Sequence, residues 1–176
     1  MASLGHQVIA FDIDEDKIAS LKMGTVPFHE PGLEPILKQE LASGRLTFTS
    51  SLTDVAAQAD VHFICVGTPQ SASSDAADLS QVREAVHSLA PLITRPSLVV
   101  GKSTVPVGTA QWIADTLVAE SPAASDTHLV WNPEFLREGF AVEDTLHPDR
   151  IVLGYTHEED IEVLKDVYAA PLAEGT

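Results

Sequence analysis

The chain has 176 residues, of which 44% are hydrophobic and 20% charged, and its formal net charge at pH 7 is −16. This composition predicts a soluble globular protein with one core rather than a disordered segment. The acidic charge excludes nucleic acid as an expected partner, because phosphate backbones are bound by basic surfaces. The absence of an apolar run of roughly 18 residues excludes a membrane span, and a single cysteine favours the cytoplasm.

Short apolar runs alternate along the chain with segments whose apolar residues repeat at helical spacing. We predict strands at 7–11, 46–49, 61–67, 97–102, 128–131 and 150–155, and helices at 14–24, 31–44, 78–93, 106–120 and 158–169. Gly24 and Gly44 are placed to end the first two helices. Asp78 and Gln81 have the spacing of a capping box, and Pro106 is predicted in the first turn of its helix.

This alternation predicts an α/β fold with a doubly wound, mostly parallel sheet of the Rossmann type. Ligands of such sheets bind beyond the carboxyl ends of the strands. Four strand exits therefore become candidate sites, and they begin at Asp12, Gly67, Lys102 and Asn132.

Asp12 ends the first predicted strand, in the sequence IAFDID. An acid in this place can accept hydrogen bonds from the ribose of NAD and repel the extra phosphate of NADP. Two alternatives stay open: Asp12 or Asp14 only caps the next helix, or Asp12 binds an adenosyl ribose, as in methyltransferases. The glycine-rich turn expected about 20 residues earlier is absent, so we expect a chain that lacks the first strand, through truncation or a misassigned start.

The next two exits combine small residues with hydroxyl groups. Gly67 permits a close approach of the backbone to a ligand, and Thr68 adds a hydroxyl group. Lys102, Ser103 and Thr104 precede a predicted helix start, where hydroxyls and unpaired N–H groups suit an anion or a polar ligand. Each stretch can also be an ordinary turn or helix cap.

The last exit has the sequence NPEFLREG at residues 132–139. Its carboxylates can act as bases or hold a water molecule, and Arg137 can pair with Glu134, with Glu138 or with a phosphate. A solvated turn with an apolar plug is the alternative. We expect Cys65, inside the apolar run 61–67, to be a buried and inert thiol. The seven histidines show no metal-ligand spacing, so no metal site is predicted.

The ordered set of motifs resembles the amino-terminal domain of the UDP-glucose/GDP-mannose dehydrogenase family. The stretches that carry this resemblance are GHQVIAFDIDEDKI, PFHEPGLEPIL, ADVHFICVGTP, GKSTVPVGTA and NPEFLREGFAVEDTLHPDRIVLG. The resemblance implies an NAD-dependent oxidation of a sugar alcohol to an aldehyde and then a carboxylate, through a covalent intermediate on a cysteine. The continuation HPDRIVLG favours UDP-glucose, with UDP-glucuronate as product, over GDP-mannose or UDP-N-acetylhexosamine.

The resemblance also implies roles for residues at matching positions. Asp12 would bind the adenosine ribose with Lys17 beside it, and the remaining cofactor contacts would be Val66, Gly67, Thr68, Pro69, Ser103 and Thr104. Thr104 would also hold a water near the reacting carbon, and Glu138 would be the catalytic carboxylate that assists this water. The sugar nucleotide would lie along Glu134, Phe135, Leu136, Arg137 and Glu138.

Other parts of the family's machinery have no match in this sequence. These are the catalytic cysteine, to which Cys65 does not correspond, its lysine, asparagine and aspartate, a dimerising central helix and the UDP-binding domain. We therefore expect residues 1–176 to be a partial NAD-binding domain, inactive alone, from a homodimer or larger assembly. The alternative is a non-catalytic nucleotide-binding or interaction module. Without the strand between them, strands 7–11 and 61–66 would expose their edges. The chain would then be only marginally stable, would pair these two strands directly, or would self-associate.

Overall fold

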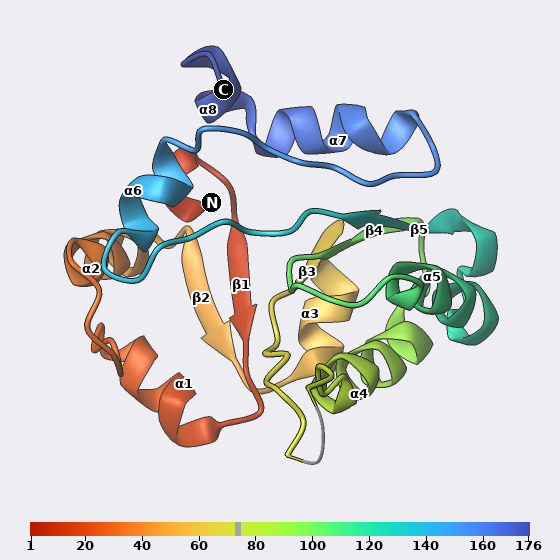
Figure 1. Ribbon diagram of the computed structural model, residues 1–176. Helices are drawn as coiled ribbons and strands as arrows, with labels where there is room; N and C mark the ends of the chain where they lie inside the picture. Colours follow the sequence, from red (N-terminus) through yellow and green to blue (C-terminus); the bar gives the residue numbers. More distant parts are fainter. Residues whose placement is uncertain (73–74) are drawn as a thin grey trace. The chain divides into compact units, whose positions relative to one another are not determined.

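The computed structural model describes residues 1–72 and 75–176 (Figure 1). The chain divides into two compact units, and each contains its own parallel sheet. The first unit comprises Met1–Val55, Phe135–Ile151 and Val163–Thr176, and the second comprises Ala56–Glu134 and Val152–Glu162. Among the described residues, no helix is both long enough and apolar enough to cross a bilayer.

The first unit is built on two parallel strands, β1 (Val8–Phe11) and β2 (Leu46–Thr49). Its helices are the 3₁₀ helix η1 (Ala2–Leu4), α1 (Glu15–Lys22), α2 (Leu33–Ser43), α6 (Ala141–Leu146) and α8 (Ala169–Ala173). Gly24 and Gly44 follow α1 and α2 with φ of 74°, a left-handed conformation that glycine adopts without a side-chain clash. The predicted ends of both helices are therefore confirmed.

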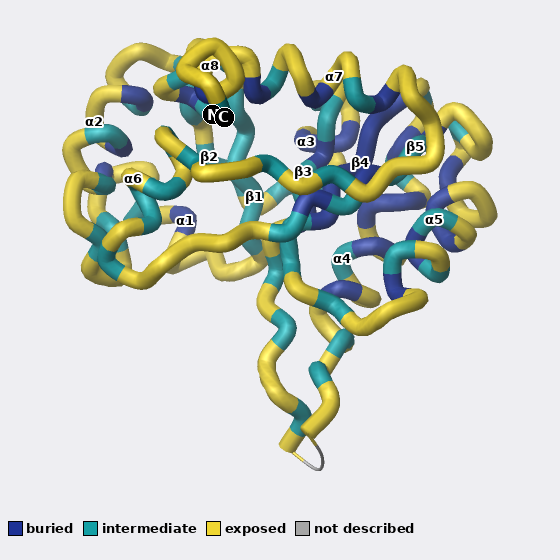
Figure 2. The backbone as a smooth tube through the Cα atoms, turned by 45° about the horizontal axis from the view of Figure 1, so that its top comes forward, coloured by how far each residue is buried: buried dark blue, intermediate teal, exposed yellow. Residues whose placement is uncertain are grey.

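The second unit is built on a three-stranded parallel sheet in the order β3-β4-β5. Its strands are β3 (Val61–Ile64), β4 (Ser97–Gly101) and β5 (Thr127–Trp131), and its helices are α4 (Ser80–Leu89), η2 (Ala90–Leu92), α5 (Thr109–Glu120) and η3 (Ala124–Asp126). Every residue of β4 is buried, and the strand is dark blue in Figure 2. Val82 and Val86 of α4 and Ile113 of α5 are fully buried. This core fixes the three strand ends that carry candidate site residues.

Two helices cross the division between the units: α3 (Leu52–Gln58), which precedes β3, and α7 (Glu159–Val167). The predicted α/β class with parallel strands is confirmed. The direct pairing of 7–11 with 61–66 is wrong, because β1 and β3 belong to different sheets.

The predicted strand at 150–155 is also wrong. Only Gly154 pairs, in an antiparallel bridge to Trp131 with N···O distances of 2.7 and 2.8 Å. The ladder does not continue toward Val152, because the carbonyl of Val152 accepts a hydrogen bond from the Asn132 side chain at 2.9 Å.

The starts of α4 and α5 differ from the ones that their sequence motifs predict. Asp78 accepts the N–H of Ser80 at 2.8 Å and does not form a capping box with Gln81, so α4 begins at Ser80. Pro106 lies in a turn before α5, since Gly108 has φ of 90° and interrupts the helical backbone. The N–H of Thr109 closes that turn on the carbonyl of Pro106 at 3.2 Å.

Candidate cofactor and substrate site

In the second unit, hydrogen bonds join the segments that follow β3 and β4. The hydroxyl of Thr68 donates to the carbonyl of Thr104 at 2.9 Å, and the hydroxyl of Ser103 donates to the carbonyl of Val66 at 2.5 Å. Adjacent parallel strands end at the same edge of a sheet, so these bonds fix two loops that the strands already bring close. The predicted cofactor residues of both loops therefore lie side by side.

The exit of β5 joins the same edge. The Lys102 ammonium donates to Oδ1 of the buried Asn132 at 3.1 Å, and the N–H of Glu134 donates to the carbonyl of Lys102 at 3.3 Å. The indole of Trp131 donates to the carbonyl of Ser103 at 3.1 Å. Burial lowers the pKa of Lys102, although the nearby charges of Cys65 and Glu134 oppose this shift. In this unit, hydrogen bonds thus connect the segments that follow β3, β4 and β5, which are three of the four predicted strand exits.

The position of Cys65 differs from the one that the sequence predicted. β3 ends at Ile64 and the residue that follows is exposed, so the expectation of a buried thiol inside the strand is wrong. Although its surface is open, protein atoms packed around the sulfur desolvate it and raise its pKa. A raised pKa keeps the thiol protonated at neutral pH, and a protonated thiol is a poor nucleophile.

In the first unit, Asp12 directly follows β1. Its Oδ1 accepts the N–H of Asp14 at 3.0 Å, and its Oδ2 forms an ion pair with the Lys17 ammonium. Desolvation opposes ionisation, but the bonds from Lys17 and Asp14 outweigh it and lower the pKa of Asp12. The cap of α1 is Asp14, whose carboxylate accepts the N–H of Lys17 at 2.9 Å. Asp12 is therefore not needed as that cap.

The Asp12 carboxylate fits the ribose of a dinucleotide. An ionised carboxylate has about four acceptor positions, and the two contacts to Asp14 and Lys17 leave room for ribose hydroxyls. Lys17 also lies beside Asp12, where the resemblance places it.

Arg137 does not pair with either glutamate proposed as its partner. It forms a two-pronged ion pair with Asp144 of α6, with Nε–Oδ2 and Nη2–Oδ1 distances of 3.0 and 2.6 Å, and its own N–H adds a third bond at 2.9 Å. These bonds lower the pKa of Asp144 to about 2. Phe135, Leu136 and Glu138 are exposed on the same segment.

Glu30 contacts the segment around Glu138, and the sequence analysis did not predict a role for it. Its carboxylate accepts the N–H of Gly139 at 3.1 Å and that of Val142 at 3.4 Å. It therefore holds the backbone next to Glu138. The stretch PFHEPGLEPIL, which contains Glu30, was the signal that could have identified it.

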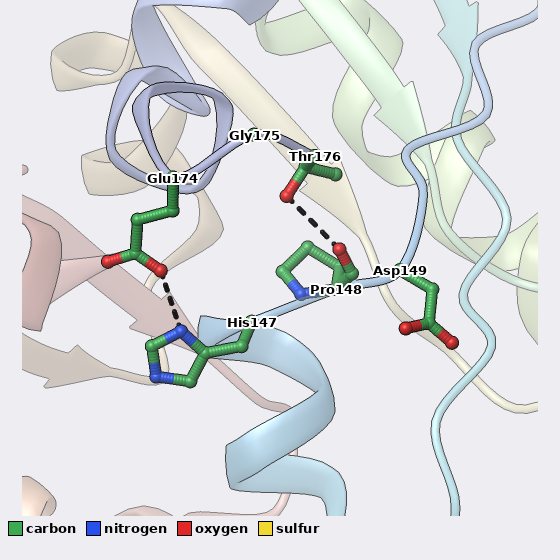
Figure 3. A pocket seen from close by; sticks show the side chains of 6 residues that line it. All are labelled: His147, Pro148, Asp149, Glu174, Gly175 and Thr176. Atoms are coloured by element: carbon green, nitrogen blue, oxygen red, sulfur yellow. Dashed lines mark hydrogen bonds and ion pairs between the residues drawn. The ribbon is translucent and has the colours of Figure 1, made fainter.

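A hollow in the first unit, formed by other residues than these strand ends, has a volume of about 410 Å³. It is lined by His147, Pro148, Asp149, Glu174, Gly175 and Thr176 (Figure 3). His147 bonds to Glu174 at 2.7 Å and Thr176 to the carbonyl of Pro148 at 3.1 Å. None of the predicted site residues lines this hollow, so the candidate site lies elsewhere.

Residues 1–171 match the family described as "UDP-glucose/GDP-mannose dehydrogenase family, NAD binding domain". The chain belongs to this family. The resemblance inferred from the motifs is thereby confirmed, and NAD is the cofactor of the family's matching domain.

Relatives and solved structures agree with the family. The chain is 45% identical over 169 residues to the UDP-glucose 6-dehydrogenase of Rhizobium meliloti (strain 1021), covering 95% of this chain and 38% of that protein. It superposes with a TM-score of 0.90 on a UDP-glucose dehydrogenase from Pyrobaculum islandicum, at 40% identity, covering 96% of this chain and 40% of the other. A GDP-mannose dehydrogenase from Pseudomonas aeruginosa gives 0.91 at 32% identity, with the same coverage. The chain thus spans about two fifths of these relatives' length.

Proposed function

We propose that this chain is the NAD-binding part of a nucleotide-sugar dehydrogenase that oxidises UDP-glucose to UDP-glucuronate in two hydride transfers. The observation that supports this most is the pair of hydrogen bonds that join the loops after β3 and β4, Thr68 to Thr104 and Ser103 to Val66. Membership of the family and the UDP-glucose dehydrogenases among its relatives support the substrate.

In this proposal the cofactor is held by two groups of residues. The Asp12 carboxylate, kept ionised by Lys17, accepts hydrogen bonds from the adenosine ribose. The second unit contributes the segment Val66, Gly67, Thr68 and Pro69 together with Ser103 and Thr104. NAD, when bound, supplies the acceptor for the hydride that leaves the sugar carbon.

The substrate contacts come from the segment after β5. Glu138, exposed and carried on a backbone that Glu30 restrains, acts as the carboxylate that assists a hydrolytic water, and Thr104 helps to hold that water. Glu134, Phe135, Leu136 and Arg137 lie along the sugar nucleotide. The side chain of Arg137 is 68% exposed despite its ion pair with Asp144, so it can still contact a phosphate.

We also propose that this chain alone does not oxidise UDP-glucose. A thiohemiacetal needs a reactive thiolate, but the only cysteine in the sequence is Cys65, whose pKa is raised by desolvation. The proposal assigns residues 1–176 to part of the NAD-binding domain of a cytoplasmic homodimer or larger assembly, and the resemblance to the family supports this.

The test is a titration of the ¹⁵N-labelled chain with NAD, followed by amide chemical shifts. We expect shifts to concentrate at residues 12–17, 66–69 and 103–104. Asp12→Asn should weaken binding about tenfold or more, because a hydrogen bond to a charged group contributes about 1.5–3 kcal/mol. Asp16→Asn removes the same charge from exposed α1 and should leave the affinity unchanged.

Three outcomes would contradict parts of the proposal. If NAD shifts amide signals evenly along the chain, or if Asp12→Asn and Asp16→Asn lose equal affinity for NAD, Asp12 is not part of the cofactor site. If GDP-mannose shifts the amide signals of residues 134–138 and UDP-glucose does not, the substrate is GDP-mannose and not UDP-glucose. Formation of NADH from NAD and UDP-glucose by the purified chain would refute its proposed inactivity.

A further inference from the structure

Two histidines and a glutamate gather at the amino end of β5 in the second unit. His128 lies near the start of this strand, His157 precedes α7 and Glu159 is the first residue of α7. The two imidazole rings stack with a centroid distance of 4.3 Å and an interplanar angle of 19°. One ligand atom from each of the three residues lies within 4.8 Å of the others. The strand exits described above are at the opposite, carboxyl end of this sheet.

A fourth residue, Asp160, fixes the ring of His128 by a hydrogen bond. It is 4% exposed, and its Oδ1 lies 2.7 Å from Nδ1 of His128. A carboxylate at this position accepts the Nδ1 proton and leaves the lone pair of the neutral ring on Nε2. Metal-binding histidines usually have such a carboxylate or carbonyl behind them.

The second oxygen of Asp160 leaves negative charge unbalanced beside this cluster. Oδ2 is buried and has no hydrogen-bond partner within residues 1–72 and 75–176. An unpaired buried carboxylate oxygen is unfavourable unless positive charge lies nearby. Glu159, with Oε1 3.9 Å from Nδ1 of His128, adds a second negative charge to the same place.

We propose that His128, His157 and Glu159 bind a divalent metal ion of the zinc class, with a water molecule as the fourth ligand. Two imidazoles and one carboxylate suit Zn²⁺, whereas Mg²⁺ and Ca²⁺ take oxygen ligands. Asp160 positions His128 and does not touch the metal. The bound ion would tie the start of β5 to the start of α7.

This proposal revises the expectation of no metal site. His128 and His157 are 29 positions apart in the sequence, so a search for short ligand spacings could not join them. The structural alternative is that the His128–Asp160 bond and the stacked rings hold the segment without a metal.

The experiment uses the tag-free 176-residue chain, freed of metal with a chelator and titrated with ZnCl₂ in a calorimeter. Excess Mg²⁺ in the buffer suppresses diffuse binding to the acidic surface. We expect one equivalent of Zn²⁺ to bind. Co²⁺, used as a second probe, should give the visible absorption of a four-coordinate site.

The variants separate the site from the rest of the surface. His157→Ala and Glu159→Gln, both at exposed positions, should each weaken Zn²⁺ binding at least about tenfold and abolish the Co²⁺ spectrum. Asp160→Asn keeps an acceptor for His128 but loses the charge, and should weaken binding about 10–100-fold. Circular dichroism should confirm that each variant stays folded.

The matched control is His87→Ala. His87 is an exposed histidine that also bonds to a carboxylate, Glu120 at 2.9 Å, so its removal should leave zinc binding unchanged. The proposal is overturned by a titration without saturable binding. It is equally overturned if His157→Ala binds as tightly as the unmodified chain, or if His87→Ala loses as much affinity.

Discussion

Glu30 and Gly139, 109 residues apart in the sequence, are joined by a hydrogen bond of 3.1 Å from the Gly139 N–H to Oε2 of Glu30. The other carboxylate oxygen accepts the N–H of Val142, in the first turn of α6, at 3.4 Å. Phe140, the N-cap residue of α6, has no side-chain acceptor of its own. Glu30 therefore supplies from a distance the acceptor that a local cap supplies in other helices.

Removal of this carboxylate should loosen the segment that carries Glu138. We expect Glu30→Ala to speed the hydrogen exchange of the Gly139 and Val142 amides and to lower the free energy of unfolding by about 1 kcal/mol, the usual cost of a lost cap. Glu30→Gln keeps one acceptor and should give a smaller change. Glu34→Ala, at an exposed position of α2, is the control. Equal exchange rates in Glu30→Ala and the parent chain would rule out this role.

A second prediction concerns Gly101, the last residue of β4. A Cβ atom at this position would overlap the six-membered ring of Trp131. Gly101→Ala should displace that ring, break the bond from its indole to the Ser103 carbonyl and destabilise the chain by about 1–3 kcal/mol. Urea unfolding and tryptophan fluorescence measure both effects. Gly5→Ser adds backbone strain, since Gly5 has φ of 102°, but its Cβ would meet no neighbour, so the fluorescence should stay unchanged.

His62 in β3 predicts a loss of stability in mild acid. It is buried, and neither ring nitrogen has a hydrogen-bond partner in the described part of the chain. Burial, and to a smaller extent the charge of Arg95, lowers the pKa of His62 below its ordinary value of 6.5. The unfolded chain therefore binds a proton first, so stability should fall as the pH drops below about 6.5.

The variant His62→Leu removes this proton uptake and the unsatisfied nitrogens. We expect it to raise the free energy of unfolding by about 1–3 kcal/mol and to flatten its dependence on pH between about 5 and 7. Urea titrations at several pH values measure this. The exposed His29, changed to leucine, serves as the control. An unchanged pH slope in His62→Leu would show that other groups cause the acid sensitivity.

The strand edges predict self-association. In the described residues, β1 has a strand partner only at β2, and β3 only at β4. Unpaired backbone groups along a strand can pair with another chain. We expect the apparent mass in size-exclusion chromatography with light scattering to rise with protein concentration. A constant monomer mass over a hundredfold dilution would contradict this expectation.

Local patterns predicted the elements of this fold well, because apolar spacing and terminal glycines are properties of neighbouring residues. The four-residue strand β2 and the ends of α1 and α2 are examples. The errors arose where distant partners decide. Gly154, for example, makes one bridge to the distant Trp131 instead of continuing a strand.

The candidate site divides in the same way. Asp12 could be placed from its strand end alone, and the resemblance to the family placed Lys17 beside it. The contacts of Glu30, of Asp144 and of His128 with His157 could not be predicted, since the partners come together only in the folded chain. The charge and type of a residue can be read from the sequence, whereas its hydrogen-bond and ion-pair partners depend on the fold.

The ion pair between Arg137 and Asp144 gives the last prediction. Its hydrogen bonds hold the pKa of Asp144 at about 2, below the value of 3.8 expected in the unfolded chain. The folded chain therefore binds this proton later than the unfolded chain does. The stabilisation is complete above about pH 3.8 and is lost as the pH falls through about 2. Asp144→Asn should remove this part of the acid sensitivity.

The measurement is an NMR titration of the Asp144 carboxyl carbon together with acid unfolding curves. Arg137→Gln should move the pKa of Asp144 back toward 3.8, because the hydrogen bonds from the Arg137 side chain are the largest cause of its shift. Arg150→Gln removes the same charge elsewhere on the first unit and should leave that pKa unchanged. If the two arginine variants shift it equally, the low pKa reflects the overall charge of the chain and not the ion pair. Arg137→Gln keeps the backbone N–H bond to Asp144, so the pKa of Asp144 should recover only part of the way toward 3.8.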